Sequence, residues 1–84
     1  MVHPSPGAQA SLDRAKRVNP DIQILYEALK SRLAHDPRTG ATPTTPHHYI
    51  MVIPPHSPKI NVEVVAEYEV DSNGNVMIKR LIFR

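Results

Sequence analysis

The sequence of 84 residues lacks cysteine altogether. This absence excludes a disulfide framework, thiolate metal ligands and a cysteine nucleophile. An apolar run near the roughly 18–20 residues that a membrane-spanning helix needs is missing as well. The first residues do not show a charged segment followed by an apolar stretch, so we expect no secretion signal and no membrane partner. The default expectation is therefore a single cytoplasmic domain over residues 1–84.

A strong excess of one charge sign is also missing. Ten Lys and Arg against eight Asp and Glu leave a formal net charge of +2. An excess this small does not indicate a nucleic-acid-binding protein, so the positions of the charges carry the information. The sequence contains neither a phosphate-cradling glycine loop nor a Gly-x-Ser-x-Gly elbow, and we expect no cofactor.

Two helices are predicted in the N-terminal half of the chain. Ser5 followed by Pro6 is a favourable helix start, with serine as the N-cap and proline at the first helical position. Asn19–Pro20 repeats this signal before a clear apolar face over residues 21–35, made by Ile22, Leu25, Tyr26, Leu29 and Leu33. Almost no linker separates the two helices, which predicts an antiparallel helical hairpin.

The C-terminal half predicts three strands. Tyr49 to Ile53 is a short β-branched run that is typical of a buried strand. Residues 62–70 and 76–84 alternate apolar and charged side chains around Asn73–Gly74, the pair that a two-residue hairpin turn favours. In this register one face turns toward the helices and carries Val62, Val64, Ala66, Tyr68 and Val70 opposite Phe83, Leu81, Lys79 and Met77. On the exposed face, Glu67 pairs with Arg80 and Glu63 with Arg84.

Two segments are expected to lie outside the packed elements. Residues 1–5 are expected to be a flexible N-terminus, because prolines at positions 4 and 6 disfavour a strand ladder. Residues 36–48 form a polar Pro/Thr-rich stretch that predicts a loop. The predicted fold is therefore α+β, with an N-terminal helical hairpin packed on one face of a three-stranded antiparallel β-meander.

Part of this pattern resembles the RelE/ParE superfamily of bacterial toxins, over roughly residues 20–84. The resemblance is carried by Leu33–Gly40, Tyr49–Ile53, Tyr68–Asp71 and Asn75–Phe83. It implies a RelE/ParE-like fold and the toxin component of a toxin–antitoxin pair of the plasmid-stabilisation type. It also implies action as an mRNA endoribonuclease or a gyrase poison, with RNA or the ribosome as a target and a cognate antitoxin that wraps around the toxin. The chain departs from the family in lacking a clear first strand and basic residues on the first meander strand.

The resemblance assigns roles to several residues. The basic residue near the end of the family's last strand corresponds to Arg80 or Arg84, so both are candidates for phosphate contact, with Glu67 or a loop histidine as the proton acceptor. We take Lys59, His47 and His48 as candidates for substrate binding. Adjacent histidines in an extended chain point to opposite sides, so no metal site is expected. Acidic neighbours would repel RNA, and ordinary cross-strand ion pairs on a solvated sheet are the alternative interpretation.

A second hypothesis comes from a different functional class. The chain could keep a RelE-like fold, lack catalysis and act as a protein-binding module. A three-stranded meander has two unpaired edges, and a domain this small gains from additional burial. An antitoxin-like strand or helix, or a second copy in a homodimer, would supply that burial. A basic cluster in the helical half is either a phosphate-contacting face or a solvated one, and it comprises Arg14, Lys16, Arg17, Lys30, Arg32 and Arg38.

Overall fold

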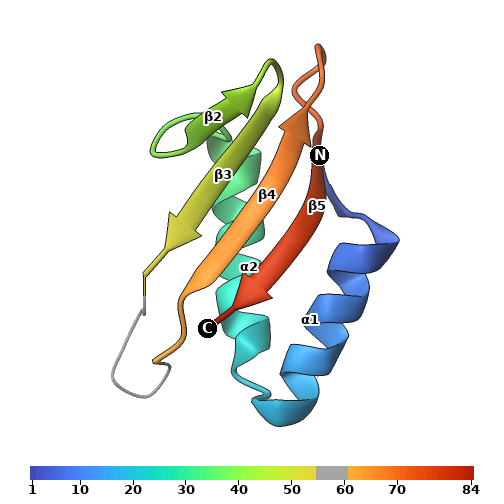
Figure 1. Cartoon of the computed structure of the whole chain (residues 1–84), viewed down its shortest axis with the longest axis vertical. Helices are drawn as coiled ribbons and strands as arrows, with labels where there is room; N and C mark the ends of the chain where they lie inside the picture. The colour runs from blue at the N-terminus through green and yellow to red at the C-terminus, as the bar shows by residue number, and fades with distance from the viewer. Residues whose placement is uncertain (55–60) are drawn as a thin grey trace.

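The computed structural model describes residues 1–54 and 61–84. Within these ranges the chain forms two helices and one five-stranded sheet (Figure 1). In chain order the elements are β1 (Val2–Pro4), α1 (Pro6–Val18), α2 (Ile22–His35), β2 (Thr42–Thr45), β3 (His48–Ile53), β4 (Val64–Val70) and β5 (Val76–Phe83). The α+β class is therefore confirmed.

Both predicted helices are confirmed, and their ends follow from local chemistry. The Ser5 hydroxyl accepts a hydrogen bond from the Ala8 backbone N–H at 3.2 Å, which satisfies a donor at the start of α1. The Asn19 side chain accepts from the Asp21 N–H at 3.0 Å in the short turn before α2. The helices run antiparallel, as the hairpin prediction required (Figure 1).

The sheet has the order β1-β5-β4-β3-β2. Its centre is the predicted antiparallel meander of β3, β4 and β5. The prediction of three strands is wrong, however, because β1 and β2 each add a strand at one edge. Since β1 runs parallel to β5, the sheet is mixed rather than purely antiparallel.

The N-terminus is part of the sheet, so the expectation of a flexible segment over residues 1–5 is wrong. Val2 is aligned with Val76 and Pro4 with Ile78. Met1 accepts a hydrogen bond from the Val76 N–H at 2.8 Å, and the Ser5 N–H donates to the Ile78 carbonyl at 2.8 Å. Because residues on either side of Pro4 supply these bonds and β1 is an edge strand, the missing proline N–H is tolerated.

The Pro/Thr-rich stretch is not a loop throughout, which corrects the prediction for residues 36–48. Thr42–Thr45 pairs antiparallel with β3, with an irregularity between Pro43 and Thr45. All four residues of β2 are exposed. The sequence of β2 has no alternation of apolar and polar side chains, so it does not predict a strand. The turn into β3 is completed by His47, which has a left-handed backbone with φ of 72°.

The β4–β5 register differs from the predicted one near the turn. Val70 pairs with Val76 and Tyr68 with Ile78, one position away from the expected alignment, whereas Glu67 pairs with Arg80 as predicted. The Asp71 carboxylate accepts from the Asn73 and Asn75 N–H groups at 2.8 and 2.9 Å, which stabilises a wider turn than Asn73–Gly74 alone. The wider turn is compensated by a β-bulge in β5 at Lys79.

The bulge changes which side chains of β5 face the helices. Val76 and Ile78 are buried, whereas Met77 and Lys79 lie on the exposed face, the reverse of the prediction for these four residues. This arrangement buries two β-branched apolar residues and leaves the lysine ammonium in water, which is the more favourable choice. Leu81, beyond the bulge, is buried as predicted.

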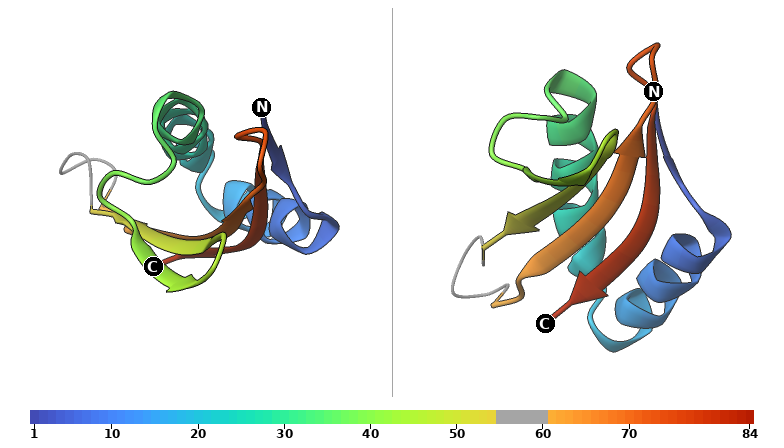
Figure 2. Two further views of the ribbon diagram at one scale, coloured as in Figure 1. Left: turned by 90° about the horizontal axis from the view of Figure 1, so that it is seen from above. Right: turned by 45° about the horizontal axis from the view of Figure 1, so that its top comes forward.

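A single core lies between the helices and one face of the sheet, which we call the inner face. Figure 2 shows the sheet curved around α2, with α1 beside β5. All five residues of the predicted α2 face are buried there. The sheet contributes Met51, Val64, Ala66, Tyr68, Val70, Val76, Ile78 and Leu81. Neither helix of the described part is long and apolar enough to cross a membrane.

Candidate functional site

The opposite side of the sheet, the outer face, carries the candidate residues. The described residues place no helix on it (Figure 2), and Val52 remains 48% exposed there. Glu67 projects from β4 and Arg80 from β5, and Arg84 directly follows β5. The structure therefore brings the three predicted catalytic residues onto one surface.

Every Lys and Arg that the described residues place on the outer face lies near a carboxylate. The nitrogen–oxygen distances are 3.8 Å for Arg80–Glu67, 3.4 Å for Arg84–Glu63 and 3.6 Å for Lys79–Glu69. The Glu67–Arg80 and Glu63–Arg84 pairs are those that the sequence predicted. Because opposite charges at these distances largely cancel at longer range, the face offers a polyanion little attraction.

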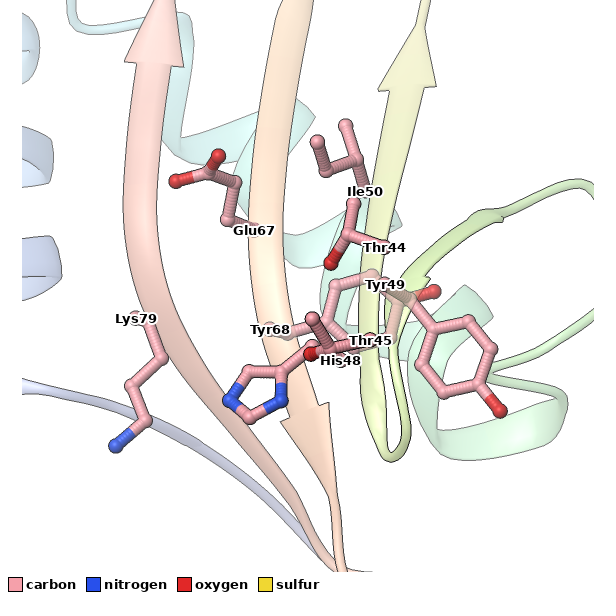
Figure 3. Close-up of a pocket in the computed structure, with 8 residues that line it drawn as sticks. All are labelled: Thr44, Thr45, His48, Tyr49, Ile50, Glu67, Tyr68 and Lys79. Carbon is pink, nitrogen blue, oxygen red and sulfur yellow. The ribbon is translucent and has the colours of Figure 1, made fainter.

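His48 is the one predicted histidine that joins this cluster. Its Nε2 lies 3.7 Å from Glu69 Oε2, the same oxygen that Lys79 approaches, and its Nδ1 lies 3.2 Å from the Pro46 carbonyl oxygen. A shallow hollow of about 200 Å³ adjoins these groups. Its lining consists of Thr44, Thr45, His48, Tyr49, Ile50, Glu67, Tyr68 and Lys79 (Figure 3).

Figure 3 shows His48, Glu67 and Lys79 projecting from three adjacent strands on one side of the sheet. A carboxylate, an imidazole and an ammonium are the groups that metal-free cleavage of a phosphodiester uses as base, acid and charge stabiliser. In this structure the ammonium and the imidazole both face Glu69. A phosphate would have to displace that carboxylate before either group could bind it.

The other two predicted substrate-binding residues are not in the cluster. His47 lies in the turn between β2 and β3, outside the lining of the hollow. Its backbone carbonyl accepts a hydrogen bond from the Val70 N–H at 2.8 Å, which ties the turn between β2 and β3 to the end of β4. Lys59 lies outside the described residues.

An apolar row crosses the middle of the outer face. Val52 on β3 is in register with Val65 on β4, and Val65 is in register with Ile82 on β5. This row differs from the prediction of a buried strand over residues 49–53, because Val52 is exposed. The signal that could have found it is the alternation within β3: Met51 is buried, so Val52 must point to the opposite side.

The two ion pairs border the apolar row in the same orientation. Glu67 lies on β4 and Glu63 immediately precedes β4, so the two carboxylates lie on either side of Val65 along the chain. Their partners lie correspondingly on either side of Ile82. Arg80 lies on β5, and Arg84 directly follows β5, where backbone hydrogen bonds of 2.6 and 2.9 Å hold it opposite Glu63. The row is therefore bordered on both sides by pairs with the carboxylate over β4 and the cation over β5.

The basic cluster of the helical half is divided between two environments. Arg14 of α1 lines a groove of about 420 Å³ together with Arg80, between α1 and β5. Lys30 of α2 instead pairs with Glu27 at 3.2 Å and lies 5.0 Å from the centre of the Tyr26 ring. The cluster is therefore not one continuous phosphate-contacting face.

The inner side of β4 holds a polar anchor at Tyr68. The Tyr68 hydroxyl donates to the Pro37 carbonyl, and its ring stacks on Tyr49 with centroids 5.8 Å apart. Burial is the main cause that raises the pKa of Tyr68 to about 12. These contacts hold the loop after α2 against the sheet and so fix the position of β2 beside the hollow.

Within residues 1–54 and 61–84, no group of three or more His, Asp or Glu side chains is placed to hold a metal ion. Comparison with known proteins gave no matching family model, no matching curated protein and no matching solved structure.

Proposed function

We propose that the protein is a RelE/ParE-like domain that acts by binding a partner protein rather than by cutting RNA. In the toxin–antitoxin setting that the resemblance implies, the partner is the cognate antitoxin-like protein. The order of a helical hairpin followed by an antiparallel meander supports the fold assignment. The choice between binding and catalysis rests on the outer face.

The observation that carries the choice is the pairing of the outer-face cations. Lys79, Arg80 and Arg84 lie 3.4–3.8 Å from glutamates that lie on β4 or, in the case of Glu63, directly before it. Stabilising a phosphorane needs cations that converge on one phosphate and are not already neutralised. A face that combines paired charges with exposed apolar side chains is instead typical of a protein–protein interface.

The experiment compares expression of the chain alone with expression beside its neighbouring reading frame. Induced alone in a bacterial host, the chain should leave growth and transcript lengths unchanged. Co-expressed with the tagged product of the adjacent frame, it should co-purify with that product in a fixed stoichiometry. Growth arrest with transcript cleavage, relieved by Arg80→Ala and not by Arg17→Ala on α1, would contradict the proposal.

One observation favours the endoribonuclease as a second candidate. Glu67, His48 and Lys79 border a single hollow, and none of them is fully buried. If this hollow is catalytic, purified chain should cleave RNA in the presence of a metal chelator. Glu67→Gln and His48→Gln should then each reduce cleavage about 10²-fold or more, whereas Arg17→Ala should not.

A further inference from the structure

We infer that the outer face is the contact surface of a homodimer, in which a second copy of this chain lies face to face on the first. The two copies are related by a two-fold axis that runs parallel to the strands, between β4 and β5. This inference goes beyond the proposed function, because it concerns the chain alone and needs no other protein.

The charges of the outer face have one order across the strands. In each of its three ion pairs the carboxylate comes from β4 or the residue before it, and the cation comes from β5 or the residue after it. A two-fold axis between these strands places β4 of one copy over β5 of the other. Each glutamate then faces a cation of the second copy, and each cation faces a glutamate. The outer face is therefore complementary to itself in charge.

The order of the charges selects this axis from two alternatives. Packed sheets keep their strands roughly aligned, which allows a two-fold axis either along the strands or at right angles to them. The axis at right angles, along the apolar row, would place Glu67 opposite Glu63 of the second copy and Arg80 opposite its Arg84. Like charges would then meet on both sides of the row, which disfavours that arrangement.

The same axis also matches the apolar row. Val65 of each copy lies over Ile82 of the other, so the centre of the interface consists of two identical apolar contacts. Val52 lies one strand farther from the axis, at the same level along the strands. The axis therefore carries Val52 past β5 of the second copy, to the side on which α1 lies (Figure 1).

A groove lies at the position that Val52 reaches. It has a volume of about 420 Å³ between α1 and β5, and its lining includes Ala15, Ile82 and Phe83. Because Arg80 and Ile82 of the lining project from the outer face, the groove opens toward the second copy. Val52 is 48% exposed in the single chain, and the groove would remove it from water. Shape and charge thus lead to the same axis.

A second copy is the occupant that the described residues themselves supply. The face calls for cations over β4, carboxylates over β5 and an apolar side chain at the groove, and the outer face turned about the axis provides all three. Strand spacing and rise give this face an outline of roughly 20 by 25 Å. Such an outline is smaller than the about 800 Å² per partner of a standard interface, so we expect a weak dimer with a dissociation constant of roughly 10 μM or higher.

Sedimentation equilibrium of the purified chain, at roughly 10 to 500 μM, tests the dimer directly. The apparent mass should rise with concentration from that of a monomer toward that of a dimer. Val65→Arg places charges at the centre of the interface and should raise the dissociation constant about tenfold or more. Ile24→Lys is the matched control and should leave the constant unchanged, because Ile24 is 57% exposed on α2, on the other side of the sheet.

Charge reversal tests the axis itself. Arg80→Glu alone places glutamates opposite one another across the interface, and Glu67→Arg alone places arginines opposite one another, so each variant should dimerise about tenfold more weakly or worse. An equimolar mixture of the two should associate, because every reversed position then faces the opposite charge. Both variants lack the ion pair within the chain, so the association of the mixture has to come from the contact between copies. Circular dichroism melting checks that both variants are folded.

Three results would overturn the inference. They are a monomer over the whole concentration range, a dimer that Val65→Arg leaves intact, and a mixture of the two charge variants that associates no better than either alone. A monomeric chain that loses co-purification with the product of the adjacent frame on Val65→Arg would assign the face to that protein instead. Failure of the proposed function is a separate outcome, because transcript cleavage by the chain would contradict that function and leave the dimer unaffected.

Discussion

The two faces of the sheet are built from the same strands and differ in what each side chain meets. On the inner face, Ala66, Ile78 and Val64 are at 0% exposure beneath the helices. On the outer face, the intervening residues are glutamates, cations and a few exposed apolar side chains. The inner face is therefore expected to determine stability, and the outer face is free to be used for recognition.

The largest expected difference between the faces concerns two adjacent residues of β5. Ile78 is fully buried and Met77 is 39% exposed. Ile78→Ala should lower the free energy of unfolding by about 2–5 kcal/mol, because it removes buried methyl groups and leaves a cavity. Met77→Ala should change it by less than about 0.5 kcal/mol. Urea unfolding of both variants gives the comparison, and a larger cost for Met77→Ala would mean that the register without a bulge is the real one.

These two residues also show why part of the fold was beyond sequence reasoning. The start of α1 was predictable because its cap at Ser5 acts locally. The predicted N-cap of the second helix, Asn19, is wrong, because α2 begins at Ile22 with Asp21 in the N-cap position. The edge strands β1 and β2 were not predictable, because three or four residues containing proline have no alternation to detect. The register of β5 depends on the width of the turn that follows Asp71. A two-residue turn without a bulge and a wider turn with a bulge place the β5 side chains on the same faces only in the half of the strand beyond the bulge.

The candidate site was predictable to a similar extent. Beyond the bulge the predicted and observed registers coincide, so the Glu67–Arg80 and Glu63–Arg84 pairs followed from the sequence. The approach of His48 and Lys79 to Glu69 could not be predicted from the sequence, because it depends on both the bulge in β5 and the pairing of β3 with β4. The apolar row needed the same cross-strand information.

A smaller effect is expected from the hydroxyl group of Tyr68, which links the inner face to the loop after α2. Tyr68→Phe should cost about 0.5–1.5 kcal/mol near neutral pH, through loss of the hydrogen bond to the Pro37 carbonyl. Thermal or urea unfolding measures this cost. The outer face of the same strand offers Glu69→Gln as a comparison, and an equal cost there would contradict the assignment of stability to the inner face.

The same tyrosine predicts an alkaline limit to stability. Its pKa rises from 10.0 in the unfolded chain to about 12 in the folded protein. The unfolded state therefore releases its proton first, so this contribution to stability is complete below pH 10.0 and is lost as the pH rises toward 12. Burial also raises the pKa of Tyr26, which acts in the same direction. Unfolding measured between these pH values should show a shallower decline for Tyr68→Phe than for the unaltered chain.

A deletion can test the bulge that separates the two halves of β5. Removing Lys79 would leave every other β5 side chain on its present face, because the bulged residue is the extra one. We expect a loss of less than about 1 kcal/mol, comparable to that of an exposed ion pair, since the Lys79–Glu69 contact disappears. Deletion of Met77 would instead invert the faces at the end of the strand and should unfold the chain. Equal effects of the two deletions in urea unfolding would rule out the bulge as described.

The smallest expected effect is on the outer-face ion pairs themselves. The side chains of Arg80 and Glu67 are 67% and 41% exposed and lie 3.8 Å apart. Exposed pairs of this kind contribute about 0.2–1 kcal/mol, and less as salt rises. A double-mutant cycle with Arg80→Ala and Glu67→Ala at low and high salt measures the coupling. A coupling well above that range that persists in salt would mean that the pair stabilises the sheet in the way the inner face does, and the separation of stability from recognition between the two faces would then fail.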